Sequence, residues 1–196
     1  MLLEEAIGYS FYRRNELSKA FFLTGEGANG KSTFLDMLKN LLGQINYSSL
    51  DLAELEERFS IVTLSGKLAN VGDDISDDFL QGRAISTFKK IVSGNQVKAE
   101  NKGVDAFFFN PYTKLYFSAN SLPRTKSKGF GAILRRLVII PFNGRFTKDD
   151  PDYDPFITWK LKDEQVMKYL IQLGIQGLKR VLENRDSQNP RKSKRN

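Results

Sequence analysis

One glycine-rich stretch constrains this chain more than any other part of it. Residues 20–33 read AFFLTGEGANGKST, in which a short apolar run leads into the pattern G-x-x-x-x-G-K-[ST] and then into a helical pattern. Gly25 and Gly30 allow backbone angles that other residues rarely adopt, so successive N–H groups can turn inward and form an anion-binding concavity. This pattern predicts a phosphate-binding loop for a nucleoside triphosphate with Mg²⁺.

The chemistry of each residue type predicts its role in this loop. A helix that begins at Gly30 or Lys31 adds free N–H groups and the positive end of its dipole. We expect Lys31 to contact the β and γ phosphates and the Ser32 hydroxyl to bind Mg²⁺. The residues expected to bind the nucleotide are Gly25, Glu26, Gly27, Ala28, Asn29, Gly30, Lys31, Ser32 and Thr33.

The same glycines also fit G-x-G-x-x-G, the pattern of a dinucleotide-binding turn, with Asp51 near the place of the ribose-binding acid. Residues 43–50 are too polar and too short for the buried strand that should carry such an acid. That interpretation also gives no role to Lys31 and Ser32. We therefore favour ATP over a dinucleotide as the ligand.

Composition excludes several classes of protein. The 196 residues contain no cysteine and no histidine, which excludes a disulfide scaffold and histidine acid–base chemistry and leaves hard metal ions on oxygen ligands. There is no apolar run of membrane-spanning length and no signal-peptide pattern, so we expect a cytoplasmic protein. The net charge is +7, but residues 185–196 hold five cations against one acid, and we expect 184–196 to be a basic, disordered tail.

Three further apolar runs carry polar residues at their ends. Residues 66–72 predict a strand that ends at Asp73 and Asp74, the Walker B pattern, in which one acid completes the Mg²⁺ shell and another polarises the attacking water. Residues 114–120 predict a buried strand ending in Asn120, whose carboxamide can lie between the γ-phosphate and that water. Residues 137–142 predict a fourth buried strand, directly after Arg135 and Arg136.

The remaining pattern predicts helices and one β-hairpin. Residues 96–100 and 104–109 flank a glycine turn, which places Lys102 at the tip with Lys98 nearby, where they contact either a nucleic-acid phosphate or only solvent. We expect Phe146, Phe156, Trp159 and Leu161 to add contacts to the core. Helical patterns cover 2–12, 31–42, 51–59, 79–91 and 163–183, the last weakened by Gly174 and Gly177.

Taken in order, these motifs resemble those of superfamily 3 helicases. The chain looks like the helicase domain of phage, plasmid and poxvirus primase-helicases over roughly residues 1–183. The resemblance is carried by residues 25–33, Asp73-Asp74, residues 89–94 with Lys98, Lys102-Gly103, residues 120–123 and Arg135-Arg136.

The resemblance implies an AAA+ fold of the α/β class, a P-loop NTPase core whose parallel sheet is flanked by helices and carries a β-hairpin insertion. It implies an ATPase domain over 1–183, with a lead-in helix within 1–15 and a C-terminal helical part over 143–183. It also implies a viral or mobile-element origin and a hexameric ring in the full-length protein. The ring would bind single-stranded or forked DNA, together with a primase domain or other replication proteins.

Site roles carry over residue by residue from this resemblance. Lys31, Ser32, Asp73 and Asp74 would act on ATP and Mg²⁺, with Ser32 and Asp73 as metal ligands, and Asn120 would be the sensor. Arg136, or else Arg135, would be the finger inserted into the neighbouring subunit's site, and Lys102 would grip the DNA backbone. Many relatives have a glutamate in place of one acid, so the base can be either Asp73 or Asp74.

Three functional classes remain open at this point. The first is an ATP-driven DNA helicase or translocase. The second is an AAA+ ATPase that loads or remodels replication proteins without unwinding. The third is a small-molecule or nucleotide kinase, which is expected to carry lid arginines over the phosphates within one subunit. The paired arginines fall at the finger position instead, which argues against the kinase. The helicase is the leading interpretation, and DNA-stimulated ATP hydrolysis would separate it from the other two.

Overall fold

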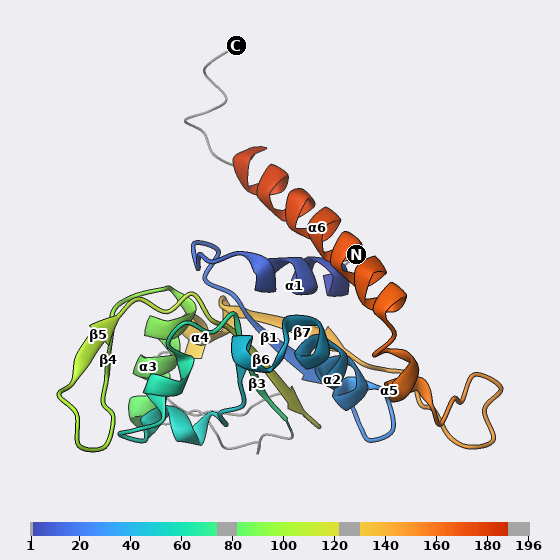
Figure 1. The fold of residues 1–196 in the computed structure, drawn as a ribbon, viewed down its shortest axis with the longest axis horizontal. Coiled ribbons are helices and arrows are strands. Elements are labelled where there is room, and N and C mark those ends of the chain that lie inside the picture. The colour runs from blue at the N-terminus through green and yellow to red at the C-terminus, as the bar shows by residue number, and fades with distance from the viewer. Residues whose placement is uncertain (1, 74–81, 122–129, 188–196) are drawn as a thin grey trace, which may run out of the picture.

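The computed structural model describes residues 2–73, 82–121 and 130–187 (Figure 1). Its centre is a five-stranded sheet in the order β2-β3-β6-β1-β7, and every pairing in it is parallel. A separate antiparallel pair, β4-β5, forms the expected hairpin. The strands are β1 (Ala20–Thr24), β2 (Tyr47–Ser48), β3 (Ala69–Gly72), β4 (Val97–Ala99), β5 (Phe107–Phe109), β6 (Lys114–Ala119) and β7 (Leu137–Pro141).

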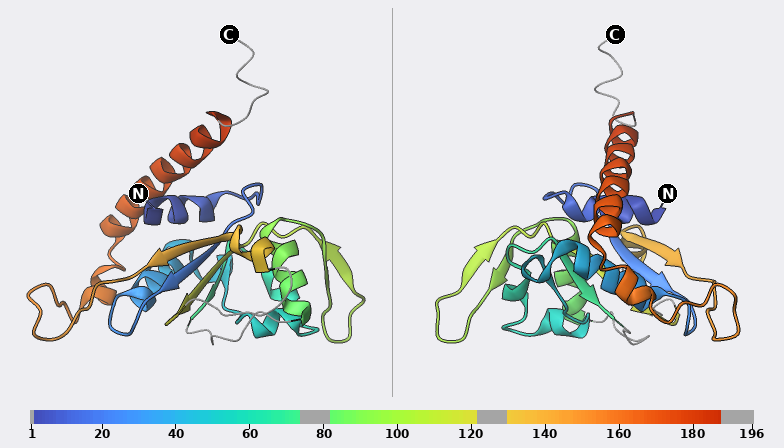
Figure 2. Two further views of the ribbon diagram at one scale, coloured as in Figure 1. Left: turned by 180° about the vertical axis from the view of Figure 1, so that it is seen from behind. Right: turned by 45° about the vertical axis from the view of Figure 1, so that its right-hand side comes forward.

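Helices cover both faces of this sheet, which confirms the α/β class (Figure 2). The α-helices are α1 (Leu2–Phe11), α2 (Lys31–Leu42), α3 (Gly82–Val92), α4 (Phe130–Leu134), α5 (Ile157–Lys160) and α6 (Glu164–Ser187). Short 3-10 helices span η1 (Gln44–Asn46), η2 (Ala53–Glu56) and η3 (Ile61–Leu64). None of the helices in the described ranges is both long and apolar enough to cross a membrane.

The alternation of side chains along the strands divides the core into two clusters. Phe22 and Phe117 pack with residues of α3, α4 and the 3-10 segments. Phe21 and Tyr116 face the other way, where they pack with α1 and α2, and their rings stack with centroids 4.7 Å apart. The buried Tyr116 hydroxyl lies 2.7 Å from the Ser10 hydroxyl and donates to the Ala6 carbonyl at 2.5 Å, so its polar end is satisfied.

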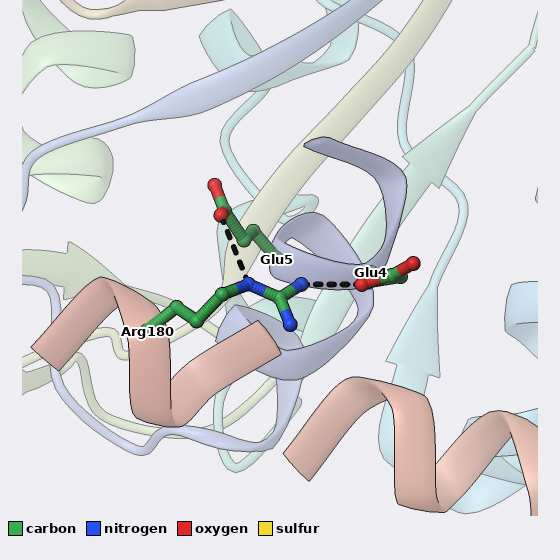
Figure 3. A network of polar contacts seen from close by, with 3 residues as sticks. All are labelled: Glu4, Glu5 and Arg180. Atoms are coloured by element: carbon green, nitrogen blue, oxygen red, sulfur yellow. Dashed lines mark hydrogen bonds and ion pairs between the residues drawn. The ribbon is translucent and has the colours of Figure 1, made fainter. Parts of the chain in front are cut away.

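Helix α6 lies against α1 through a close contact between glycines. A Cβ added to Gly8 would lie 2.0 Å from the Gly174 carbonyl oxygen, and one added to Gly177 would lie 2.3 Å from that of Glu4. Arg180 reinforces the contact by pairing with Glu4 and Glu5 (Figure 3). Gly174 and Gly177, which sequence analysis treated as weakening the helix, therefore permit its packing.

Several local expectations were wrong. Residues 51–59 contain only the 3-10 helix η2 instead of an α-helix. The Asn70 side chain bonds the backbone of Leu50, just before this segment, at 2.8 and 2.9 Å. Strand β7 was expected to be fully buried, but it is an edge strand in which only Leu137 and Ile140 are buried. Phe156 and Trp159 are 67% and 76% exposed, so they add nothing to the core, and Phe146 is 45% exposed.

Other expectations were confirmed or fall partly outside the described residues. Leu161 packs on the second core cluster, as expected. Helix α6 continues to Ser187, so the first part of the expected tail is helical, whereas 188–196 lies outside the described residues. The same holds for residues 79–81 at the expected start of α3.

Candidate nucleotide-binding site

The predicted phosphate loop lies between β1 and α2, at the carboxyl edge of the sheet. The helix begins at Lys31, as expected, after Gly30 in a left-handed conformation with a φ of 88°. Gly25 has a φ of 145°, and a Cβ added there would lie 2.3 Å from the Phe142 carbonyl oxygen. Both glycines are therefore required by the path of the loop, as the motif predicts.

Lys31 is buried and its ammonium group lies over the loop. The group donates to the Gly25 carbonyl, and it lies 3.3 Å from Oδ1 of Asn29. The amide nitrogen of Asn29 donates in turn to the Phe142 carbonyl at 3.0 Å. The cation is thus held at the concavity where phosphate binding is expected.

Strand register brings the other predicted residues to the same edge. Gly72 pairs with Phe117, so Asp73 lies beside Ser118, and the buried Ser118 hydroxyl donates to the Asp73 carboxylate. Thr24 pairs with Ala119, which places Asn120 beside the first residue of the loop. Parallel strands end at one edge, and the order of strands decides which ends are neighbours.

These residues line one hollow of about 440 Å³. Its walls contain the loop with Lys31 and Ser32, together with Asp73 and Asn120 from the neighbouring strand ends. Asp74 lies outside the described residues. The candidate ligands for the phosphates, the metal and the attacking water are therefore brought together. The lining residues are Gly27, Ala28, Asn29, Gly30, Lys31, Ser32, Thr33, Asp73, Ser118 and Asn120.

Arg135 and Arg136 lie at the opposite edge of the sheet. The Ala20 amide, at the start of β1, donates to the Arg136 carbonyl at 2.8 Å. Since a strand rises about 3.3 Å per residue, the five residues of β1 separate this end from the loop by roughly 15 Å. Neither arginine is therefore placed to act on the phosphate loop of its own subunit.

The two arginines differ in their surroundings. The Arg136 guanidinium donates to the Ala132 carbonyl at 2.6 Å and lies 3.4 Å from the Ser93 hydroxyl. Burial, and secondarily the charge of Arg135, lowers the pKa of Arg136 from its usual value. Arg135 is exposed. Arg135 is thus the more accessible of the two.

The hairpin presents Lys102 on the exposed connection between β4 and β5, whereas Lys98 is engaged in an ion pair. The Lys98 ammonium lies 2.7 Å from the Glu100 carboxylate, which also accepts from Arg58 at 2.5 Å. Hydrogen bonds from Lys98 and then Arg58 lower the pKa of the Glu100 carboxyl. Glu100 therefore offsets the charge of Lys98.

Sequence analysis missed two residues near the loop. Ser118 is a small polar residue within an apolar strand, a pattern that could have marked it as facing a polar site. Arg145 lines a second hollow of about 740 Å³ beside the loop, with Glu26, Gly27 and Asn120 among its neighbours. Nothing in the motif pattern marks Arg145, because its position depends on the pairing of β7 with β1.

Comparisons with known proteins agree with this fold. The chain is 34% identical over 160 residues to the protein named "Putative helicase L207/L206" of Acanthamoeba polyphaga mimivirus, and the match covers 79% of this chain and 16% of that protein. The apo structure of the NrS-1 C-terminal region superposes with a TM-score of 0.66 at 16% identity, covering 89% of this chain and 43% of that one. An A-form apo structure of the same region also gives 0.66, at 17% identity, covering 89% and 42%.

The chain thus spans about a sixth of the viral protein and less than half of the NrS-1 region. A family model described as "Family of unknown function (DUF5906)" matches residues 23–136, which include the phosphate loop, Asp73, the hairpin, Asn120 and both arginines. This match covers more than half of the 196 residues. The chain therefore belongs to the DUF5906 family.

Proposed function

We propose that this chain is the ATP-dependent DNA helicase or translocase domain of a replicative primase-helicase. The observation that carries the proposal is the single hollow in which the phosphate loop, Asp73 and Asn120 meet. This combination supplies phosphate binding, a metal ligand and a group for the attacking water, which together make an NTP hydrolase. The mimivirus relative is named as a putative helicase, which favours DNA as the molecule along which the motor moves.

Different residues of the hollow would bind the phosphates, the Mg²⁺ ion and the attacking water. The amides of the loop and the Lys31 ammonium would bind the β and γ phosphates. The Ser32 hydroxyl and the Asp73 carboxylate would hold Mg²⁺, and the Ser118 hydrogen bond would fix the orientation of that carboxylate. Asn120 would position the attacking water, with Asp73 or Asp74 as its base.

The arginines would complete the site of a neighbouring subunit. Because they lie at the edge of the sheet opposite their own loop, any contact with a γ-phosphate has to be made in another copy of the chain. This placement supports ATP hydrolysis at subunit interfaces and hence a ring, which we propose for the full-length protein. The exposure of Arg135 favours it as the finger, whereas Arg136 would stabilise the turn that carries it.

The hairpin would contact the DNA backbone through Lys102. Phosphate contacts by lysine carry no sequence information, which suits a motor that must move along any sequence. Lys98 would contribute only after its pairing with Glu100 is exchanged for a phosphate.

One observation favours a second candidate, an AAA+ ATPase that loads or remodels replication proteins without unwinding. Glu100 offsets the charges of Lys98 and Arg58, which weakens the positive potential on one side of the hairpin. Among the described residues no ion pair is found for Lys102, and one such lysine on the hairpin suits a protein partner as well as DNA. The two functions differ in whether DNA stimulates ATP hydrolysis.

The test is an ATPase assay with and without single-stranded DNA, read beside the molar mass in solution from light scattering. The helicase proposal expects Mg²⁺-dependent hydrolysis that DNA stimulates several-fold when subunits assemble. A hydrolysis rate that DNA leaves unchanged but replication proteins increase would favour the remodelling ATPase. Hydrolysis by a monomer that depends on a small-molecule phosphate acceptor would identify a kinase and contradict both.

A further inference from the structure

The segment after β7 is fastened to the phosphate loop by three hydrogen bonds. The Phe142 amide donates to the Thr24 carbonyl at 2.7 Å, and the Phe142 carbonyl accepts from the Asn29 side chain at 3.0 Å. The Phe146 amide then donates to the Ala28 carbonyl at 2.7 Å. Residues 142–146, which we call the strap, therefore follow the loop along one side.

Arg145 lies inside this strap, between two residues that are bonded to the loop. Its position in the chain is therefore set by the backbone of the loop, although its side chain is exposed. The side chain lines the hollow of about 740 Å³ that also contains Glu26, Gly27 and Asn120. A long cation is thereby placed at the mouth of the site, on the opposite side of β1 from Asp73.

Within the described parts of the chain, no ion pair of Arg145 with an acid is found. Asp150 is the nearby carboxylate whose pKa the charge of Arg145 helps to lower. That carboxylate already accepts bonds from the backbone and side chain of Thr147, which are the larger causes of the lowering. The guanidinium keeps donors for an anion in the hollow.

We propose that Arg145 binds the terminal phosphate of the nucleotide held by its own subunit. This inference rests on the proposed ATPase function and adds a residue to the same site. Gly27, Ala28 and Asn120 line both hollows, so the space beside Arg145 adjoins the position where the γ-phosphate is expected. A planar guanidinium suits this position because it donates two parallel hydrogen bonds to phosphate oxygens.

Arg145 and Arg135 thus serve different sites. The two residues lie at opposite ends of β7, with Arg145 beside the loop of its own chain and Arg135 beside the start of β1. Arg145 distinguishes ATP from ADP during binding, before any subunit joins. Arg135 contributes only once a neighbour is present.

The test compares two nucleotides in equilibrium binding by calorimetry. Mg²⁺ with ADP and Mg²⁺ with the β,γ-imido analogue of ATP are each titrated into the wild-type chain, Arg145→Ala, Arg145→Lys, Lys31→Ala and the control Lys148→Ala. Lys148 is an exposed cation three residues further along that does not line either hollow. Each titration is run at a concentration where the chain is monomeric.

We expect Arg145→Ala to weaken the triphosphate analogue about tenfold and to change ADP affinity by less than about twofold, because one charge-assisted contact is lost. Arg145→Lys should fall between wild type and alanine, and Lys148→Ala should match wild type. An unchanged ratio of the two affinities in Arg145→Ala, or an equal loss for both nucleotides, would overturn the inference while leaving the ATPase proposal intact. If the wild-type chain binds neither nucleotide, the proposed function is overturned and the inference with it. The same holds if Lys31→Ala binds both nucleotides as tightly as the wild type does.

Discussion

The side-chain amide of Asn29 donates a 3.0 Å hydrogen bond to the Phe142 carbonyl and joins the phosphate loop to the strand end beside it. Its Oδ1 atom lies 3.3 Å from the Lys31 ammonium. One buried side chain therefore contacts the Lys31 ammonium and joins the loop to the sheet. The variable position of the G-x-x-x-x-G-K-[ST] motif that Asn29 occupies has a structural role in this chain.

Replacing Asn29 should loosen this arrangement. We expect Asn29→Ala to weaken binding of Mg²⁺ with the imido analogue of ATP, and to lower the free energy of unfolding by about 1 kcal/mol, since one buried hydrogen bond is lost. Calorimetric titration and urea unfolding measure the two effects. Asn40→Ala, on the exposed face of α2, is the control and should change neither. Wild-type affinity in Asn29→Ala would show that Lys31 is positioned without it.

Removing the loop cation should stop the chemistry. Lys31→Ala should abolish ATP hydrolysis, because Lys31 is the only cation among the described residues that line the hollow of about 440 Å³, and the proposed contact of Arg145 does not reach the β-phosphate. A phosphate-release assay at saturating ATP measures this. The matched control is Lys39→Ala, which removes a half-buried lysine paired with Asp36, two turns further along the same helix, and should hydrolyse ATP at the wild-type rate. A variant at Lys31 that keeps most of its rate would remove the loop from the mechanism.

The finger arginine should act between subunits. Arg135→Ala is expected to bind nucleotide normally and to lose turnover by about 10³ or more, the range for a finger supplied in trans. Mixing it with Lys31→Ala subunits should restore part of the rate, since each variant supplies what the other lacks.

The neighbouring position is the comparison for that experiment. Arg136→Ala should lower the melting temperature, because contacts with Ala132 and Ser93 are lost. If Arg136→Ala alone abolished turnover and was rescued in mixtures, the finger would be Arg136. No recovery in mixed assemblies that demonstrably form would indicate a site built within one subunit.

The hairpin lysine should affect DNA and leave nucleotide chemistry unchanged. Lys102→Ala should keep the basal ATPase rate and weaken single-stranded DNA binding about equally for all sequences. The slope of log affinity against log salt should fall by about 0.7, the single-strand value for one phosphate contact. Fluorescence anisotropy at several salt concentrations measures the slope, with the exposed Lys168→Ala on α6 as the control. Unchanged affinity and unchanged DNA stimulation would favour the protein-remodelling ATPase.

The glycine contact between α1 and α6 should be sensitive to a single methyl group. Gly8→Ala should lower the free energy of unfolding by about 1–3 kcal/mol, because its Cβ would lie 2.0 Å from the Gly174 carbonyl oxygen and force the helices apart. Thermal unfolding measures the change. Arg180→Ala removes the ion pairs across the same contact and should destabilise the protein less than Gly8→Ala does, since the pairs are partly exposed. A Gly8→Ala protein as stable as wild type would show that the helices can separate at little cost.

The phosphate loop, its flanking strand and helix, and the two buried strands that lead to Asp73 and Asn120 could all be predicted from the sequence. These features are local: the residues that form them are close together in the chain, and the backbone angles that glycine permits and the apolar periodicity are properties of short windows. The boundaries of β1 and of α2 agree with the prediction for the same reason. The hairpin could also be predicted from the sequence, because its two strands are joined by one short connection.

Which strand ends are neighbours could not be predicted from the sequence, because it depends on the order of the strands in the folded sheet. The order β2-β3-β6-β1-β7 places Asn120 on one side of the loop and the strap with Arg145 on the other, and no short window of sequence contains that order. The same limit applies to Gly174 and Gly177, which have low helix propensity in isolation but allow α1 and α6 to touch. It also applies to Phe156 and Trp159, which look like core residues by type but are exposed because no described element covers them. Contacts between distant segments depend on the packing free energy of the whole fold. That free energy selects one order of strands and helices among the several that the local sequence pattern allows.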